Sequence, residues 1–165
     1  MELEDKMTGF IHKTLSDLMS ALPTTIRIRL EWEGALPQVP ITGVTYNSRD
    51  VQAGYIFFAV KGTKGDGHEF IPHAVERGAV AVVGSHPVSG LSVPYLQVDE
   101  PREALAYFAA AFYNHPSRYM AVIGITGTDG KTTTANLIYR ILIASGLPVG
   151  IISTVNAVIG DEVVD

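Results

Sequence analysis

The stretch YMAVIGITGTDGKTTT, residues 119–134, places an apolar run directly before a glycine-rich turn and a lysine. A continuous apolar run of this kind is typical of a buried strand, and the glycines predict a turn. KTTTANLIYRILIAS, residues 131–145, then has the length of a helix that Gly146 ends. LPVGIIST, residues 147–154, begins a second strand. Strand, glycine-rich loop, helix and strand together predict a βαβ unit with a parallel sheet.

The glycine-rich loop has the context of a phosphate-binding loop without the usual spacing. The Walker A pattern is G-x-x-x-x-G-K-[ST], and here Gly124 stands one residue too early relative to Gly130 and Lys131. Gly127 and Gly130 can supply the bends instead, and backbone N–H groups at a helix start favour an anion. The alternatives are a glycine-rich turn that binds nothing and a Rossmann loop, whose G-x-G-x-x-G spacing is not found here.

On the phosphate-loop interpretation, Lys131 reaches the β- and γ-phosphates and is the candidate catalytic residue. The hydroxyl group of Thr132 is the candidate ligand for Mg²⁺. A carboxylate beside phosphates is repulsive unless it faces away or lies near Mg²⁺, so Asp129 is the unusual member of the loop. The sequence therefore predicts a site for ATP and Mg²⁺ that consists of Gly127, Thr128, Asp129, Gly130, Lys131, Thr132 and Thr133.

The chain before this loop alternates between short apolar runs and helical patterns. Strands are expected over residues 26–30, 55–60, 79–83 and 94–98, and helices near residues 12–22, 70–78 and 101–114. His115-Pro116 disfavours helix continuation and marks the candidate boundary between a domain over 1–117 and a second over 118–165. The expected fold class is α/β: a small mixed α/β N-terminal domain, followed by the first βαβ unit of a P-loop domain.

Composition excludes several classes of function. Of the 165 residues, 47% are hydrophobic and 18% are charged, which is an ordinary globular balance. The net charge of −5 argues against a general nucleic-acid binder. The absence of cysteine excludes thiolate catalysis and zinc–cysteine sites. The apolar runs are shorter than the roughly 18 residues of a membrane helix, and the acidic start MELEDKMTG is no secretory signal. We therefore expect a soluble cytoplasmic protein.

Two stretches resemble one known family. TGTDGKTTT, residues 126–134, resembles the ATP loop of the Mur ligases, T-G-T-N-G-K-T in most members, in which threonine replaces the first Walker glycine. Residues 46–83, YNSRDVQAGYIFFAVKGTKGDGHEFIPHAVERGAVAVV, resemble the N-terminal domain that the MurE and MurF ligases share. Asp129 and Asn47 depart from the asparagine and the aspartate that are usual there. FYNHPS, residues 112–117, resembles the join of the MurE type, so the chain is identified as an N-terminal part of a MurE-type ligase.

This resemblance implies an ATP-dependent, amide-forming ligase of peptidoglycan (cell wall) precursor synthesis. Such an enzyme adds the third amino acid to UDP-N-acetylmuramoyl-L-alanyl-D-glutamate through an acyl phosphate and releases ADP and phosphate. The implied partners are these small molecules, the UDP-N-acetylmuramoyl peptide and the amino acid, with neither nucleic acid nor membrane. Carried over by position, the residues that bind the uridine nucleotide are Tyr46, Ser48, Arg49, Thr63, Lys64 and Gly65. Further essential residues are implied beyond this stretch, so the rest of its own chain is required and this chain alone is expected to be inactive.

Other interpretations stay open at this point. One is a MurF-type ligase that adds D-alanyl-D-alanine, another is a P-loop NTPase unrelated to the cell wall, and a third is a non-catalytic module in which Asp129 weakens the loop. Arg49 pairs either with a pyrophosphate or with a carboxylate of its own domain. Asp66 and Gly67 are interpreted as turn residues, and His68 as a residue that fixes its loop by a hydrogen bond.

Overall fold

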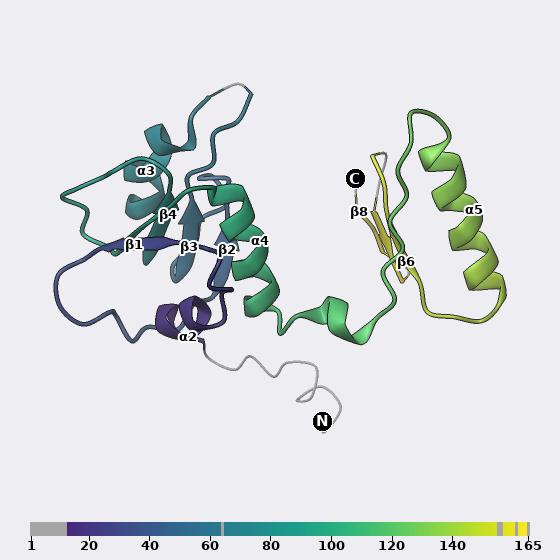
Figure 1. Cartoon of the computed structure of the whole chain (residues 1–165), viewed down its shortest axis with the longest axis horizontal. Coiled ribbons are helices and arrows are strands. Elements are labelled where there is room, and N and C mark those ends of the chain that lie inside the picture. The colour runs from purple at the N-terminus through teal and green to yellow at the C-terminus, as the bar shows by residue number, and fades with distance from the viewer. Residues whose placement is uncertain (1–12, 64, 155–156, 161, 165) are drawn as a thin grey trace. The chain divides into compact units, whose positions relative to one another are not determined.

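The computed structural model describes residues 13–63, 65–154, 157–160 and 162–164. The chain divides into two compact units, Met1–Tyr119 and Met120–Asp165, and each is described here by itself (Figure 1). Within the described residues, no helix is both long and apolar enough to span a bilayer.

The first unit is built on a five-stranded sheet with the order β1-β5-β4-β3-β2. Strands β2 to β5 pair in parallel, and β1 pairs antiparallel with β5 at the edge. This arrangement confirms the predicted mixed α/β architecture, and the strand expected over residues 26–30 lies at one edge of the sheet. The strands are β1 (Ile28–Glu31), β2 (Gly43–Thr45), β3 (Tyr55–Phe58), β4 (Ala81–Gly84) and β5 (Tyr95–Val98). Strand β2 was not predicted, because three residues carry too little periodicity to be recognised.

Helices cover both faces of this sheet (Figure 1). The helical segments are α2 (Leu15–Ser20), the 3₁₀ turn η1 (Gly67–Phe70), α3 (Ile71–Glu76), α4 (Pro101–Phe112) and the 3₁₀ turn η2 (Pro116–Tyr119). Apolar residues of α2 and α4 pack with Ile56 and Phe58 in one core, and residues of α3 pack with Phe57 in a second core on the other face. Both faces of the sheet are therefore shielded from water. Consecutive residues of β3 face opposite cores, which explains why the strand is a continuous apolar run.

The helix ends follow from local sequence. Thr14 caps α2, and Asp17 completes a capping box by accepting from the Thr14 N–H at 2.8 Å. Helix α4 ends in a Schellman motif: the His115 N–H donates to the Ala110 carbonyl at 2.6 Å, while Asn114 has a left-handed φ of 61°. The Lys13 ammonium group donates to the Ala111 carbonyl and to Asn114 Oδ1, so a positive charge lies at the negative end of this helix.

The second unit contains one helix and a small sheet. Helix α5 spans Lys131–Ala144, its C-cap is Ser145, and Gly146 follows with a φ of 78°, as the sequence predicted. Strands β6 (Gly150–Ile152), β7 (Ala157–Ile159) and β8 (Glu162–Val164) form an antiparallel sheet in that order.

The expected buried strand over residues 119–125 is not formed, so that prediction was wrong for this structure. Tyr119 ends η2, and residues 121–127 carry no assigned strand. Val122 is 71% exposed and Ile123 is 57% exposed, so the run is not buried either. The predicted parallel pairing across α5 is likewise absent, since β6 pairs with β7 instead. A strand requires a neighbour for its N–H and C=O groups, and within the described residues no strand flanks this segment.

Packing of α4 on the sheet leads to a stability prediction. Phe108 is fully buried and meets Phe58 edge-to-face, with ring centroids 5.4 Å apart at 69°. Phe108→Ala should lower the free energy of unfolding by about 3–5 kcal/mol, from lost burial and the resulting cavity. Urea denaturation followed by fluorescence of Trp32, the single tryptophan of the chain, reports on this unit.

The matched control is Tyr107→Ala on the same helix, because Tyr107 is 37% exposed and its truncation leaves a smaller gap. If Phe108→Ala lowers the free energy of unfolding no more than Tyr107→Ala does, the proposed packing of Phe108 against the sheet is contradicted.

Candidate functional site

The carboxyl edge of the parallel sheet collects the loops that carry the first set of predicted site residues. Thr45 ends β2 and pairs with Phe57 near the end of β3, so the segments that follow these strands start side by side. Residues 46–49 follow β2, and residues 59–66 follow β3. Ligands of open α/β sheets bind at this edge, because the strand interiors are covered on both faces.

The segment after β2 is a turn shaped by Asn47. Its side-chain oxygen accepts from the Arg49 N–H at 3.2 Å, and its amide group donates to Asp50 Oδ2 at 2.9 Å. Ser48 is 8% exposed, whereas Tyr46 is 65% exposed and Arg49 is exposed. Among the described residues, no carboxylate lies within ion-pair distance of Arg49. Within four consecutive residues the turn thus carries an exposed phenol ring, an exposed guanidinium group and a hydroxyl group on the nearly buried Ser48.

The segment after β3 is a short closed loop. Lys61 and Asp66 form an isolated antiparallel bridge at its base, and the Gly62 N–H donates to the Gly65 carbonyl at 2.9 Å. Thr63 and Gly65 are exposed at its tip. Lys64, which was predicted to line the same site, lies outside the described residues.

A polar cluster continues this edge toward β4 and β5. Asp66 accepts from the His68 N–H at 3.0 Å, and this bond, followed by the side-chain bond to His68, lowers the pKa of Asp66. The hydroxyl group of Tyr95 donates to the His86 carbonyl at 2.5 Å. Burial raises the pKa of Tyr95 to about 12, and the charge of Asp66 adds to the effect.

Asp66, His68 and His86 gather although 18 residues separate the two histidines, with candidate ligand atoms within 4.8 Å of one another. The contact of His86 with Asp66 and His68 was not predicted, because no local spacing in the sequence signals a contact between two different loops. The sequence identified His68 as a loop-fixing residue, and its hydrogen bonds agree with that interpretation.

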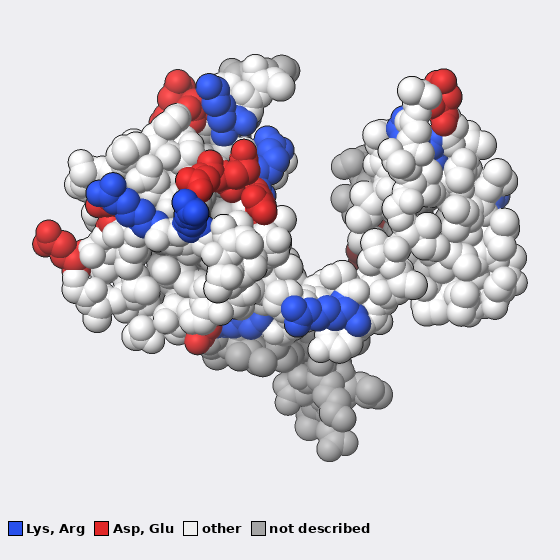
Figure 2. All heavy atoms as spheres, in the orientation of Figure 1, with Lys and Arg blue, Asp and Glu red and all other residues white. Residues whose placement is uncertain are grey.

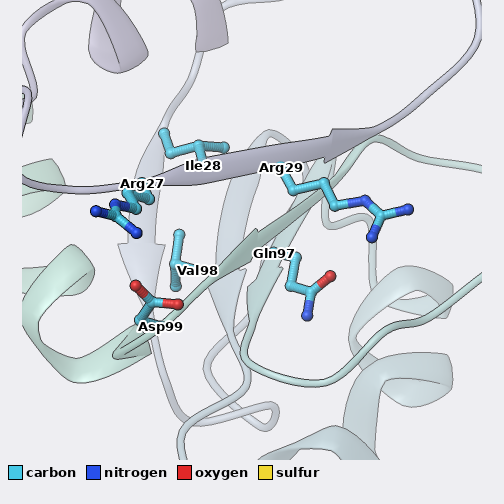
Figure 3. Close-up of a pocket in the computed structure, with 6 residues that line it drawn as sticks. All are labelled: Arg27, Ile28, Arg29, Gln97, Val98 and Asp99. Atoms are coloured by element: carbon cyan, nitrogen blue, oxygen red, sulfur yellow. The ribbon is translucent and has the colours of Figure 1, made fainter.

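A shallow pocket of about 260 Å³ lies at the β1–β5 edge, lined by Arg27, Ile28, Arg29, Gln97, Val98 and Asp99. Figure 3 shows Arg27 and Asp99 at one side and Arg29 with Gln97 at the other. Gln97 donates to the Ser85 carbonyl at 3.1 Å, while its Oε1 is buried with no hydrogen-bond partner among the described residues. None of the residues predicted from sequence lines this pocket.

The second set of predicted residues lies in the second unit, in the loop before α5 and its first turn. Gly130 is the N-cap with a left-handed φ of 75°, and Gly127 has a φ of 152°. The first backbone bond at the helix start runs from the Thr134 N–H to the Gly130 carbonyl at 2.9 Å. The N–H groups of the preceding turn therefore lack intrahelical acceptors and point out of the helix end.

Lys131 folds over this loop. Its ammonium group donates to the carbonyls of Gly127 at 2.5 Å and Thr128 at 3.0 Å. Thr128, Asp129, Thr132 and Thr133 are exposed around it, so all seven predicted residues belong to one loop and one helical turn. The arrangement joins a lysine, several hydroxyl groups and outward N–H donors, which together suit a polyphosphate.

The visible charges do not indicate a nucleic-acid surface. Figure 2 shows basic and acidic side chains interspersed over the displayed face of the first unit, without a continuous basic patch.

Two family models match the chain: the Mur ligase family catalytic domain over residues 40–113 and the Mur ligase middle domain over residues 125–163. The UDP-N-acetylmuramoyl-L-alanyl-D-glutamate–2,6-diaminopimelate ligase of Aquifex aeolicus is 49% identical over 123 residues, 74% of this chain and 25% of that protein. The UDP-N-acetylmuramyl-tripeptide synthetase of Deinococcus radiodurans is 46% identical over 145 residues, 86% of this chain and 28% of that protein. The chain thus spans about a quarter of the length of the curated relatives it matches.

Among solved structures, MurF ligase from Thermotoga maritima in complex with ADP matches with a TM-score of 0.51 and 31% identity. The match covers 63% of this chain and 24% of that one. The sequence identity of this chain is therefore higher to the diaminopimelate ligase and to the tripeptide synthetase than to this MurF structure.

Burial of Tyr95 leads to a pH prediction. Its pKa in the folded chain, about 12, lies above the ordinary 10.0. The protonated phenol is therefore favoured by folding, and its contribution is complete below about pH 10 and lost as pH rises toward about 12. Tyr95→Phe removes this titration, so the stability of the variant should fall less between about pH 9 and pH 11.5 in urea denaturation followed by Trp32 fluorescence.

At pH 8 the free energy of unfolding of Tyr95→Phe should be about 1 kcal/mol lower than that of the wild type, because the hydrogen bond to the His86 carbonyl is lost. Tyr107→Phe, at a more exposed tyrosine, serves as the control. Equal alkaline losses in the wild type and in Tyr95→Phe would show that Tyr95 is not the titrating group.

Proposed function

Because this chain belongs to the Mur ligase family, we propose that it carries the uridine-nucleotide site and the ATP loop of a MurE-type ligase. The whole protein would add an amino acid to UDP-N-acetylmuramoyl-L-alanyl-D-glutamate and release ADP and phosphate, as a step of peptidoglycan precursor synthesis. The observation that carries this proposal is the 49% identity to a ligase named for that substrate, over 74% of this chain. MurF-type relatives match less closely, which favours the third residue over D-alanyl-D-alanine as the group added.

The carboxyl edge of the first unit is the proposed place of the uridine nucleotide. The loops after β2 and β3 lie on neighbouring parallel strands and bring Tyr46, Ser48 and Thr63 to one edge. The hydroxyl groups of Ser48 and Thr63 can donate to uracil or phosphate oxygens, and the exposed ring of Tyr46 offers a stacking surface. Arg49, which has no described ion pair, is free to contact the diphosphate. Gly65 belongs to the same loop, and Lys64, which precedes it in the sequence, is the remaining residue of the proposed set.

The loop before α5 is the proposed place of ATP, with Gly127, Thr128, Asp129 and Gly130 around the phosphates. The donor set fits a triphosphate, because the loop offers one ammonium group and the N–H groups of a helix N-terminus. Thr132 would hold Mg²⁺ through its hydroxyl group, and Thr133 lies next to it in the first turn. When bound, Mg²⁺ neutralises the charge that develops on the phosphates.

The chemistry proposed for this chain is positioning and charge neutralisation. Lys131 would exchange its two carbonyl partners for phosphate oxygens, because a positive ammonium group attracts a negatively charged oxygen more strongly than a neutral carbonyl oxygen. Its charge then stabilises the transferred phosphoryl group as the substrate carboxylate attacks it. The acyl phosphate formed is the electrophile for the amine of the incoming amino acid, and phosphate leaves. The division into a uridine domain over 1–117 and an ATP domain over 118–165 is part of this proposal.

Titration with UMP tests the first site. The wild-type chain should bind UMP saturably in calorimetry, and Ser48→Ala should weaken binding about three- to tenfold, the value of one hydrogen bond. Ser89→Ala, an exposed serine in the loop after β4, is the matched control and should leave the affinity unchanged. A wild-type chain that binds no UMP, or a Ser48→Ala variant that binds as well as the wild type, would count against this site.

Titration with ADP tests the second site. Lys131→Ala removes the ammonium group from the loop and should weaken ADP binding at least about tenfold, because a hydrogen bond to a charged group contributes about 1.5–3 kcal/mol. Arg140→Ala, a basic residue exposed on the same helix, is the control for the loss of one positive charge. Equal losses in the two variants would mean that the effect is general electrostatics and not a loop contact.

A further inference from the structure

The Asp66, His68 and His86 cluster has the composition of a metal site, but its hydrogen bonds exclude that role. His68 Nδ1 lies 2.6 Å from Asp66 Oδ1, while His68 Nε2 lies 3.0 Å from the Ser85 nitrogen and 3.3 Å from the His86 nitrogen. Backbone N–H groups only donate, so Nε2 must be the acceptor and Nδ1 carries the proton. A metal on Nδ1 would force the proton onto Nε2, against two N–H donors. Both ring nitrogens are therefore already committed.

These contacts join two loops of the carboxyl edge. Asp66 closes the loop after β3, and Ser85 and His86 begin the loop after β4. The side chain of His68 is 11% exposed, so its hydrogen bonds are shielded from competing water. His86 adds a ring contact, with the two imidazole centroids 4.5 Å apart. The side chain of His68 thus connects the base of the loop that carries Thr63 and Gly65 to the start of the loop after β4.

Two glycines keep the space that this arrangement needs. A Cβ at Gly84 would lie 2.5 Å from His68 Nε2 and would also meet the hydroxyl group of Tyr95. A Cβ at Gly67 would lie 2.6 Å from the Val60 nitrogen, where the Gly67 N–H donates to the Val60 carbonyl at 3.1 Å. Asp66, Gly67 and His68 therefore act as a unit. Asp66 caps η1, Gly67 allows a close backbone contact with Val60, and His68 accepts hydrogen bonds from the loop after β4.

We propose that His68 is a positioning residue of the uridine-nucleotide site, acting through its Nε2 acceptor to hold the loop of Thr63 and Gly65 in its binding conformation. The proposal rests on the proposed function, which places the nucleotide on this loop. A loop that is already ordered before binding loses little conformational entropy when the ligand binds. The hydrogen bonds to His68 Nε2 therefore raise nucleotide affinity although His68 does not contact the ligand.

Two substitutions separate the role of the Nε2 acceptor of His68 from the role of its Nδ1 donor. In His68→Gln the side-chain oxygen reaches the position of Nε2 and keeps the acceptor for the Ser85 and His86 N–H groups. In His68→Asn the amide group reaches the position of Nδ1 and keeps the donor to Asp66 only. His73→Asn, at an exposed histidine of α3, is the matched control.

The first readout is calorimetric titration of each variant of this chain with UMP. His68→Gln and His73→Asn should bind within about twofold of the wild type, and His68→Asn should bind about tenfold more weakly. Wild-type affinity in His68→Asn would overturn the proposal. Equal weakening in His68→Gln and His68→Asn would also overturn it, because the loss would then follow the ring and not its acceptor.

The second readout is amide hydrogen exchange without nucleotide, which does not depend on the proposed function. The Gly62 and Gly67 N–H groups, both bonded across the loop base, should exchange faster in His68→Asn and at the wild-type rate in His68→Gln. Unchanged exchange rates in His68→Asn would contradict the claim that His68 Nε2 holds the two loops together. If exchange follows the acceptor but the wild type binds no UMP, the uridine function fails while the tie between the loops stands.

Discussion

Burial of a parallel sheet on both faces is the constraint from which the rest of the first unit follows. Ile56, Phe57 and Phe58 are all fully buried, although alternate residues face opposite cores. These residues of β3 therefore offer no polar side chain, and the proposed binding groups of this unit come from segments that follow the strands. Parallel pairing sends those segments to the same edge, so that the short turn after β2 and the loops after β3 and β4 become neighbours.

Local features were readable from the sequence, and features that depend on a distant partner were not. The helix expected near residues 12–22, the end of α4 near Asn114 and the start of α5 at Lys131 each depend on a few adjacent residues. The run at 119–125 has the composition of a strand, yet composition cannot say whether a neighbour is there to pair with it. The meeting of His68 and His86 is a consequence of strand order, which periodicity alone does not encode.

The two departures from the family pattern have different physical weight. Asn47 replaces an aspartate, but its side-chain oxygen still accepts from the Arg49 N–H, and its amide group adds a bond to Asp50. The turn is therefore satisfied with either residue. Asp129 is exposed in a loop proposed for phosphates, and no corresponding compensation is built into its surroundings among the described hydrogen bonds. The departure at 129 thus bears on the proposed phosphate site, whereas the one at 47 leaves the hydrogen bond from the Arg49 N–H in place.

The contact of Lys13 with the end of α4 joins residues 98 positions apart. Strand β1 likewise pairs with β5, which lies far along the chain. Such distant closure is costly in chain entropy and slow to form. During synthesis the first unit cannot be completed until Ala111 and Asn114 have left the ribosome, by which time β2, β3 and β4 have long been available. Before α4 emerges, the core around Ile56 and Phe58 lacks the apolar side chains of this helix, such as Phe108. The nascent chain is therefore most exposed to aggregation just before α4 emerges.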